Sequence, residues 1–322
     1  FLKSPSVSVA MASYNGAKFL AVQLDSVLSQ TRPPDEIVIC DDGSTDQTEA
    51  IVVERAATSA CPIRFERNPV RLGYARNFLR AASMCRGDII AFCDQDDWWH
   101  PEKLERALLP FEDAETLLVY HNVHVVDEQM RPLGLLYDAP AEEAALSIQP
   151  LAPWHHSYGL VQLFRSSLRA FDNYWEKSVN HVVQTPSPLS HDQWYFFLAQ
   201  VLGKVVFLDE VLGAYRQHGG NSVGAIQKRA TVGASLLKRF EHYGWTDDKA
   251  AEAARARAEI LDGIMPEEAG AQARVRLLAE RYELLASRLQ RRADVYRDEG
   301  MLQRLRNLLA SIQAGDYSDW PW

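Results

Sequence analysis

Three aspartates stand close together in the segment Asp88–Pro101, which reads DIIAFCDQDDWWHP. Asp94, Asp96 and Asp97 follow an apolar run that is typical of a buried strand. Carboxylates this close stay ionised only when a cation or strong hydrogen-bond donors offset their repulsion. Mg²⁺ and Mn²⁺ prefer oxygen ligands and commonly keep coordination positions for a phosphate. The cluster therefore predicts a metal site that meets a diphosphate, and the alternative is a solvated acidic loop or a helix N-terminus.

A second pair of acids, Asp41 and Asp42, ends another strand-like run, EIVIC. Strand and helix patterns alternate over the first hundred residues, which predicts a parallel sheet covered by helices on both faces. Ligands of such sheets bind at the carboxyl ends of the strands, so both acid sets are expected to line one crevice. Strands are expected at Val7–Met11, Glu36–Cys40, Ile63–Glu66 and Asp88–Cys93, and helices at Phe19–Gln30, Thr48–Ala57 and Asn77–Cys85.

The rest of the chain divides near residue 228, where the composition changes. One further strand is expected at Leu117–Val126, and residues 154–224 show a mixed pattern with aromatics and histidines. Residues 229–310 are rich in Ala, Arg, Leu and Glu, which predicts two to four helices. We expect a catalytic domain over 1–228, with a nucleotide-sugar half at about 1–110 and an acceptor half at about 111–228, and a helical extension over 229–322.

The bulk composition limits the class of protein. The chain has 322 residues and a formal net charge of −9, so it is a poor candidate for nucleic-acid binding, which needs clustered Lys and Arg. Its four cysteines show no metal-binding or CxxC spacing, which fits a reducing compartment. No apolar run reaches the ~18 residues of a membrane-spanning helix, and no signal peptide is visible. We expect a cytoplasmic protein, with peripheral contact at the inner face of the cytoplasmic membrane as an alternative.

Several motifs in the order seen here carry a resemblance to a known family. They are SVAMASYNGAKFL, PPDEIVICDDGSTDQT, NPVRLGYARNFLRAA and GDIIAFCDQDDWWHPEKL. Together they resemble glycosyltransferase family 2, whose members have the GT-A fold and invert the anomeric centre. The later HDQW and YRQHGGNSVG segments are similar to the bacterial rhamnosyltransferase branch. The resemblance is strongest over residues 5–110, extends to 224 and does not cover the helical tail.

The resemblance implies a nucleotide site in the first half of the chain. Ser13, Tyr14 and Asp42 match the residues that hold the base, where a carboxylate accepts from an imide N–H and a tyrosine stacks. The alternative for Asp42 is a turn residue, because Asp-Gly sequences favour turns. Asp41 could then bind the base instead. Arg76 matches a basic residue near the nucleotide.

The resemblance also implies a role for each acid of the cluster. Asp94 matches a ribose or sugar contact and Asp96 a ligand of Mg²⁺ or Mn²⁺, with Asp97 as a helper. His218 matches a residue that some relatives use on the metal or the diphosphate. A lone histidine is more often part of a core or a surface, which is the alternative for His218.

Inverting transfer needs a base that takes the proton of the acceptor hydroxyl. Asp192 in SHDQW matches this base, although His191 stands where many members have Glu. The alternative for Asp192 is a first-turn acid of a helix. Three tryptophans could offer ring faces to an acceptor sugar, and their alternative is core packing: Trp98, Trp99 and Trp194.

These observations predict a metal-dependent inverting transferase. We expect it to move a sugar, with L-rhamnose from dTDP-rhamnose as one candidate and a UDP-hexose as another, to a hydroxyl of a bacterial surface polysaccharide or lipid-linked glycan. A receiver domain would be much shorter, and a dehydrogenase would show GxGxxG after the first strand. A non-catalytic sugar-binding or scaffold subunit remains the alternative from another class.

The helical tail, residues 229–322, has several candidate partners. It could pack on the catalytic domain, form a homo-oligomer, join another transferase module or meet a membrane-associated glycolipid. Four arginines could contact anionic lipid, and their alternative is a solvated helix face: Arg288, Arg291, Arg292 and Arg297.

Overall fold

The structure is a computed structural model of the 322-residue chain. It describes residues 4–137, 154–183, 185–221, 236–264, 266, 269–297 and 300–316. The chain forms two compact units, one of residues 1–170 and 191–227 and the other of residues 171–190 and 228–322. Our expectation had placed residues 171–190 with the catalytic part.

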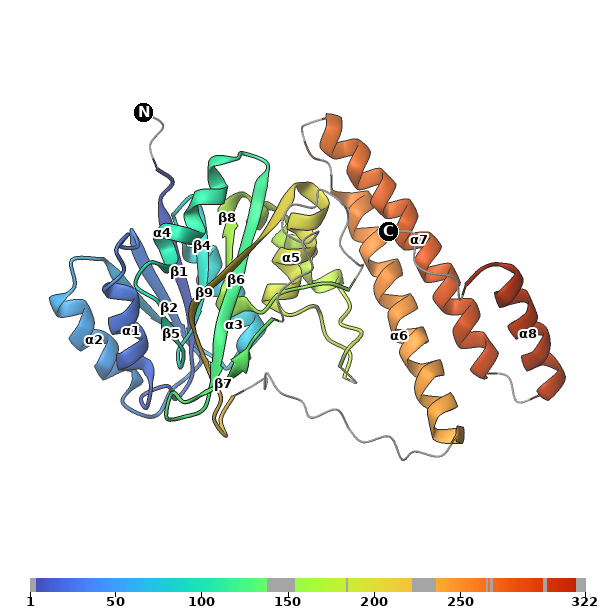
Figure 1. The fold of residues 1–322 in the computed structure, drawn as a ribbon, viewed down its shortest axis with the longest axis horizontal. Helices are drawn as coiled ribbons and strands as arrows, with labels where there is room; N and C mark the ends of the chain where they lie inside the picture. The colour runs from blue at the N-terminus through green and yellow to red at the C-terminus, as the bar shows by residue number, and fades with distance from the viewer. Residues whose placement is uncertain are drawn as a thin grey trace. The chain divides into compact units, whose positions relative to one another are not determined.

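The first unit is built on one mixed sheet of nine strands, in the order β3-β2-β1-β4-β8-β6-β9-β5, with β7 paired to β6 (Figure 1). The pairs among β1–β4 are parallel, β8 runs antiparallel to both β4 and β6, and β6 and β9 are parallel. The strands are β1 Val7–Ser13, β2 Glu36–Asp41, β3 Ile63–Arg67, β4 Ile89–Asp94, β5 Trp98–Trp99, β6 Thr116–Val126, β7 Pro132–Leu135, β8 Gln162–Arg165 and β9 Lys204–Arg216.

Helices pack on both faces of this sheet, and alternation along the strands decides which residues face which layer. In β4, Ala91 and Cys93 belong to the core cluster that includes residues of α1, α2 and α4. Phe92 points the other way and contacts Phe78 of α3 and Tyr195 of α5. The helices of this unit are α1 Leu20–Leu28, α2 Thr48–Thr58, α3 Tyr74–Met84, α4 Lys103–Leu108 and α5 His191–Leu202, with 3₁₀ segments at Leu109–Glu112, Gly159–Val161 and, continuing into the second unit, Ser166–Lys177.

Strand register brings the two acid sets to one edge of the sheet. The central strand β1 pairs with β2 on one side, where Ser13 lies opposite Asp41. It pairs with β4 on the other side, where Ala12 lies opposite Asp94. The carboxyl ends of β1, β2 and β4 therefore meet, as the alternating pattern predicted.

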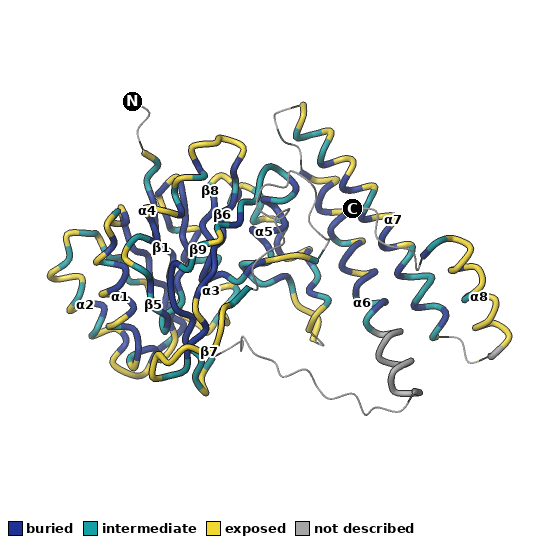
Figure 2. Tube along the Cα trace, in the orientation of Figure 1, coloured by how far each residue is buried: buried dark blue, intermediate teal, exposed yellow. Residues whose placement is uncertain are grey.

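The second unit contains long helices in its described residues. Helix α6 Leu236–Gly263 packs along α7 Ala269–Arg297, and α8 Met301–Gln313 packs on α7. Figure 2 shows buried residues along the facing sides of α6 and α7 and mostly exposed residues on α8. The hydroxyl of Tyr174 donates to the carbonyl of Gly263 at 2.8 Å, which ties residues 171–190 to α6. Across the residues that the structure describes, no helix is apolar enough over a sufficient length to cross a bilayer.

The expected strands and helices over the first hundred residues are all present, and the largest boundary difference is at α3. Helix α3 begins at Tyr74, three residues before the expected start at Asn77. Gly73, with φ of +80°, turns the chain into the helix, and the sequence pattern did not reveal that its N–H is held by an acid. Strands β5, β7, β8 and β9 were not expected.

Candidate active site

Asp41 shapes the turn after β2. Its Oδ1 accepts from the hydroxyl of Ser13 at 3.0 Å and from that of Ser44, and its Oδ2 accepts from the N–H groups of Gly43 at 3.1 Å and Ser44 at 2.8 Å. Four donors match the four acceptor positions of a carboxylate. Asp41 is fully buried, so it has neither exposure nor spare capacity for a ligand. Ser13 is buried as well, and its hydroxyl is used inside the turn.

Asp42 has one acceptor position left. Its Oδ1 accepts from Asn68 Nδ2 at 2.9 Å and from the N–H of Leu72 at 2.6 Å, and its Oδ2 accepts from the N–H of Gly73 at 2.8 Å. Three donors leave one hydrogen-bond position on Oδ2, unlike the saturated Asp41, and Arg71 Nε lies 4.0 Å from that oxygen. Asp42 therefore holds the loop before α3 and keeps capacity for one further donor.

Tyr14 presents an aromatic face beside this acid. The guanidinium of Arg71 lies 3.9 Å from the centre of the Tyr14 ring, and Tyr14 is 38% exposed. Gln95, in the acidic loop after β4, fixes the backbone of Tyr14 by accepting from its N–H at 3.0 Å and donating to its carbonyl at 3.1 Å. A side chain at Gly16 would collide with Gln95, since a Cβ there would lie 2.1 Å from its Oε1. Arg76 lies in the first turn of α3 and is exposed.

The acids after β4 are poorly compensated. Burial, followed by the negative charges of Asp96 and Asp192, raises the pKa of Asp94 to about 8. Asp97 is 1% exposed, and its Oδ1 accepts from the N–H of Arg216 at 3.0 Å. Its Oδ2 has no hydrogen-bond partner among the described residues. Burial and the charges of Asp96 and Asp94 raise the pKa of Asp97 well above its usual value.

A buried lysine lies near this cluster, and the sequence reasoning missed it. Lys103 is 1% exposed, its Nζ donates to the carbonyl of Leu160 at 2.8 Å, and it lies 3.9 Å from the ring centre of Trp99. Burial lowers the pKa of Lys103 to about 7, against the opposing charges of Cys93, Asp97 and Asp94. The sequence signal that could have revealed it is the position of Lys103 on the same side of α4 as the buried residues Leu104 and Ala107.

Asp96 and His218 meet, although 122 residues separate them. The two side chains contact each other at 2.8 Å between His218 Nε2 and Asp96 Oδ2. The N–H of Gly220 donates to His218 Nδ1 at 3.1 Å, which assigns the ring proton to Nε2, so that His218 donates to Asp96. The ring packs on Phe19 with centroids 4.8 Å apart, and Arg216 Nε donates to the carbonyl of Asp96 at 2.9 Å.

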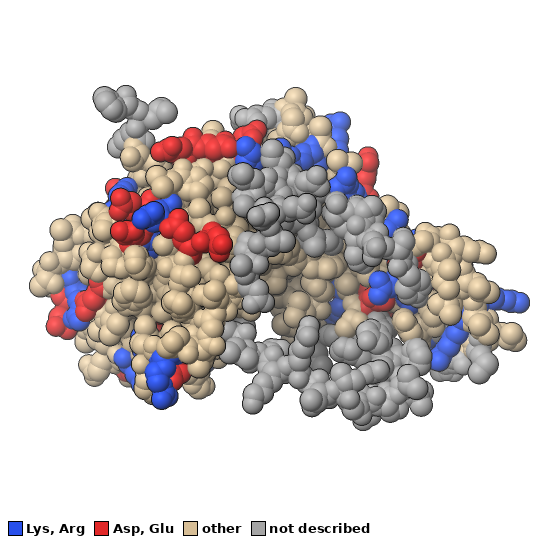
Figure 3. Space-filling view, in the orientation of Figure 1, with Lys and Arg blue, Asp and Glu red and all other residues tan. Residues whose placement is uncertain are grey.

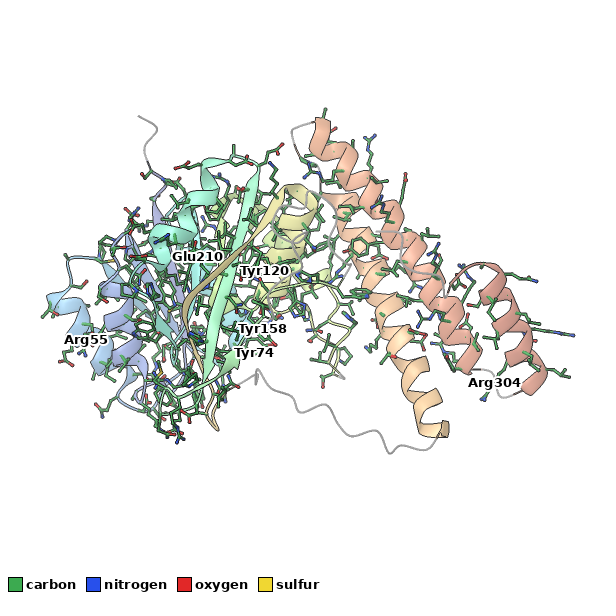
Figure 4. All side chains as sticks on the ribbon, in the orientation of Figure 1. Arg55, Tyr74, Tyr120, Tyr158, Glu210 and Arg304 are labelled. Carbon is green, nitrogen blue, oxygen red and sulfur yellow. The ribbon has the colours of Figure 1, made fainter. Side chains whose placement is uncertain are left out.

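Asp192 lies in the first turn of α5 and approaches the acids from the α3–α5 face. Its Oδ2 accepts from the N–H of Gly159 at 3.1 Å and its Oδ1 from the N–H of Gln193 at 2.9 Å. Its charge acts on Asp94 and, after burial, raises the pKa of Tyr74. Figure 4 labels Tyr74, from α3, together with Tyr158, from the segment before β8. Asp192 of α5 therefore lies near enough to Asp94 of β4 to act on it electrostatically.

His191 is buried in an aromatic cage. Its ring stacks on Phe78 with centroids 4.0 Å apart and meets Phe92 edge-on at 4.8 Å. Neither ring nitrogen has a hydrogen-bond partner among the described residues. Burial lowers the pKa of His191 to about 4, so the ring is neutral near pH 7 and packs as an aromatic group. A Cβ at Gly159 would lie 2.5 Å from its Nε2, so this contact leaves no room for a larger residue.

Comparison with known protein families identifies the group to which the chain belongs. The sequence model described as "Glycosyl transferase family 2" matches residues 8–168, half of the chain. The chain belongs to glycosyl transferase family 2. The match covers the acids of β2 and β4, and it ends before Asp192 and His218.

Relatives agree with this family membership. The chain is 29% identical over 223 residues to an uncharacterized glycosyltransferase of Nostoc sp., covering 67% of this chain and 66% of that protein. It is 29% identical over 239 residues to the putative glycosyltransferase EpsH of Bacillus subtilis, covering 71% and 65%. The chain thus spans slightly less than two thirds of the length of each.

Solved structures share the fold at low identity, and they identify it as the GT-A fold. Residues 1–349 of S. aureus TarS in complex with UDP superpose with a TM-score of 0.55 at 15% identity, covering 98% of this chain and 93% of that chain. The mannosyltransferase PcManGT from Pyrobaculum calidifontis, in complex with GDP-Man and Mn²⁺, gives a TM-score of 0.50 at 15% identity, covering 98% and 82%. The expected α/β GT-A class with further helices toward the C-terminus is confirmed.

The tryptophans of this family 2 site differ in exposure. Trp99 is 2% and Trp194 is 0% exposed, so neither offers a ring face to a sugar, and the acceptor role expected for them was wrong. Trp99 packs under Lys103, and Trp194 packs within α5 against Phe197 with centroids 6.0 Å apart. Trp98 is partly exposed and remains a candidate.

The residues after β4 suit a divalent cation that is completed by a ligand. Among the described residues, no three His, Cys, Asp or Glu side chains form a ready metal cage. Mg²⁺ sites are often held by one or two carboxylates and substrate phosphates, so Asp96 beside Asp94 and Asp97 fits this donor set. His218 donates to Asp96 in this geometry, which orients the carboxylate. Direct coordination by His218 would need the proton on Nδ1 and loss of the bond from Gly220, and it stays a prediction.

Proposed function

We propose that this family 2 protein is an inverting glycosyltransferase. It would move a sugar from a nucleotide-diphosphate donor to a hydroxyl of a bacterial cell-surface glycan or a lipid-linked glycan. The observation that carries the proposal is the position of Asp192 near the acids at the end of β4: its neighbour His191 meets Phe92 of β4 edge-on with centroids 4.8 Å apart, and the charge of Asp192 acts on Asp94. A base on one side and a diphosphate site on the other are what an in-line displacement requires.

Asp192 would be the base. As the acceptor oxygen bonds to the anomeric carbon, its O–H bond breaks and the proton passes to the Asp192 carboxylate. The bond between the anomeric carbon and the diphosphate oxygen breaks on the opposite face, and its electron pair leaves with the nucleotide. The N–H groups of Gly159 and Gln193 each donate to one oxygen of Asp192, which orients the carboxylate at the start of α5.

The nucleotide would lie at the ends of β1 and β2. The spare acceptor position on Asp42 suits the imide N–H of uracil or thymine, and the exposed ring of Tyr14 suits stacking on the base. Arg76, in the first turn of α3, would lie near the diphosphate. Ser13 would act through the turn that it holds with Asp41.

The donor remains the less defined part. The rhamnosyltransferase-like HDQW and YRQHGGNSVG segments favour dTDP-L-rhamnose, and a UDP-hexose is the alternative. TarS was solved with UDP and with UDP-GlcNAc, and PcManGT with GDP-Man and Mn²⁺, which supports a nucleotide sugar and a divalent cation here. When bound at Asp96, Mg²⁺ or Mn²⁺ would offset the negative charge of the leaving diphosphate.

A donor screen on the purified chain tests this function. dTDP- and UDP-sugars are offered with Mn²⁺, Mg²⁺ or EDTA, and released nucleotide is measured. We expect release with one donor class, dependent on the cation. A chain that neither releases nucleotide nor binds any donor would be the scaffold alternative, and release that EDTA leaves unchanged would remove the cation from the proposal.

A further inference from the structure

Helix α8 carries a continuous apolar stripe that faces solvent. Four of its large apolar residues are 78%, 49%, 56% and 56% exposed, in the order Leu302, Leu305, Leu309 and Ile312. Their spacing of three, four and three residues places them within an arc of about 80° on a helix of 3.6 residues per turn. Single exposed leucines are ordinary on a protein surface, whereas four in one stripe mark an interaction face.

The other side of α8 already has its partner. Ser311 is fully buried, and its hydroxyl donates to Asp316 Oδ2 at 2.7 Å. Asn307 Nδ2 donates to the carbonyl of Asp294 in α7 at 3.3 Å. The apolar stripe therefore lies away from the side that packs on α7, and folding of this unit does not use it.

The charge of α8 is of one sign. Residues 301–313 include Arg304 and Arg306 and no Asp or Glu. The acid that follows, Asp316, is buried and paired with Arg291, whose Nε and Nη2 donate to it at 2.8 and 2.6 Å. Figure 3 shows α8 with tan and blue atoms on the viewed face, and Figure 4 labels Arg304 beside α8 on the side toward α7.

We propose that α8 binds an anionic lipid surface. Its leucines and isoleucine would enter the boundary between headgroups and acyl chains, and Arg306, beside the stripe, would meet lipid phosphates. An apolar face with a cation at its flank is the pattern of helices that lie in the membrane interface. Pairing of α8 with a second copy is disfavoured, because the seam would receive Arg306 from both copies and no acid of residues 301–313 to meet it.

This inference goes beyond the proposed function and does not depend on it. The acids of the first unit play no part in it, so vesicle binding and nucleotide release can succeed or fail separately. If both hold, the enzyme would work beside an acceptor that is itself carried on lipid.

Vesicle cosedimentation of the 322-residue chain tests the proposal. We expect binding to vesicles of phosphatidylcholine mixed with phosphatidylglycerol, weaker binding to phosphatidylcholine alone, and loss with added salt. The double variant Leu305→Ser/Leu309→Ser should lower the partition coefficient at least about tenfold, because two large side chains leave the interface. The matched control is Leu277→Ser/Leu284→Ser, which changes two α7 leucines of similar exposure, 48% and 49%, and should leave binding unchanged.

Three results would overturn the proposal. They are an absence of binding to the mixed vesicles, equal binding to neutral vesicles at every salt concentration, and equal losses in the α8 and α7 variants. Light scattering tests the alternative that a second copy of the chain covers the stripe. If wild type were a dimer that did not bind vesicles, and the α8 variant were a monomer, the stripe would be a dimer interface. Far-UV circular dichroism reports folding of both variants, and the single change Arg306→Gln on the surface supplies a second test that should reduce only the anionic-vesicle binding.

Discussion

Buried acids are treated differently at the strand ends and in the C-terminal helices. At the strand ends, Asp97 is almost fully buried with one carboxylate oxygen unpartnered among the described residues, and the pKa of Asp94 is raised to about 8 by burial and neighbouring acids. In the helices, Asp316 is equally buried but receives two hydrogen bonds from Arg291 and one from Ser311. Burial opposes ionisation of Asp316, yet these donors hold its pKa below the usual value.

The difference teaches how to separate structural acids from functional ones. A buried charge is costly unless it is paired and hydrogen-bonded, so a fold without further demands pairs it, as the helices do. Uncompensated acids at one edge of a sheet lower the stability of the ligand-free protein. Their negative charges become favourable when a cation and its ligand bind.

The largest effect is expected from Asp192→Asn. Loss of a general base should lower the transfer rate by about 10²- to 10⁴-fold, while donor binding stays close to normal. Transfer is followed by product formation and donor binding by calorimetry. Asp209→Asn, an exposed acid of the same unit in β9, is the control and should leave both unchanged. Normal transfer by the Asp192 variant would assign the base to another group.

The next effect is expected from Asp96→Ala. Removal of the proposed cation ligand should weaken cation-supported donor binding by at least about tenfold and leave the weaker binding in EDTA unaltered. Calorimetric titration of donor with and without Mn²⁺ measures both values. Equal donor affinity of wild type and variant in Mn²⁺ would place the cation elsewhere.

The paired acid of the helices should behave in the opposite way. Asp316→Asn breaks a buried pair whose partner, Arg291, is partly exposed, so we expect a loss of about 2 to 3 kcal/mol in the free energy of unfolding and no change in nucleotide release. Denaturant unfolding and the donor assay measure the two quantities.

The matched change at the strand ends is Asp97→Asn. It should cost little stability or raise it, because Asp97 has raised pKa and an unpartnered oxygen in the described structure. A larger loss from Asp97→Asn than from Asp316→Asn would reverse the comparison between the two regions.

The sequence predicted the parallel half of the sheet better than the rest. Apolar runs such as Ile89–Cys93 are local signals, and parallel strands bring their ends together by topology. The order β4-β8-β6-β9-β5 depends on pairings between distant segments, such as Trp98 with Ala214, which no local pattern contains. For the same reason no local pattern predicted the contact of His218 with Asp96, and the family resemblance matched each residue separately to a ligand of the metal or the diphosphate.

Burial also decided between residues that sequence alone left equivalent. Asp41 and Asp42 stand side by side, but only the structure shows that Asp41 is saturated by four donors. Adjacent tryptophans likewise separated, since Trp99 is buried and Trp98 is partly exposed. Residue type suggested the chemistry, and the packing of distant segments assigned it.

The smallest effect concerns His191, a buried group beside the base that carries no charge at neutral pH. Its pKa is lowered to about 4 by burial, against about 6.5 in an unfolded chain. As the pH falls below 6.5, the unfolded chain binds a proton at His191, whereas the folded protein does not until about pH 4. The contribution of His191 to the free energy of unfolding is therefore complete above pH 6.5 and declines between pH 6.5 and about pH 4. Between pH 6.5 and 5 this amounts to about 2 kcal/mol.

His191→Phe removes the titrating group and keeps an aromatic ring against Phe78. We expect the free energy of unfolding to fall less for the variant than for wild type between pH 7 and pH 5. Each protein is compared with itself at the two pH values, so the cost of fitting a Phe ring against Gly159 cancels. The control, His124→Phe, changes an exposed histidine of β6 and should follow the wild-type curve. If His191→Phe followed that curve as well, the His191 ring of the folded wild-type protein would be accessible to protons. The aromatic cage would then not lower the pKa of His191.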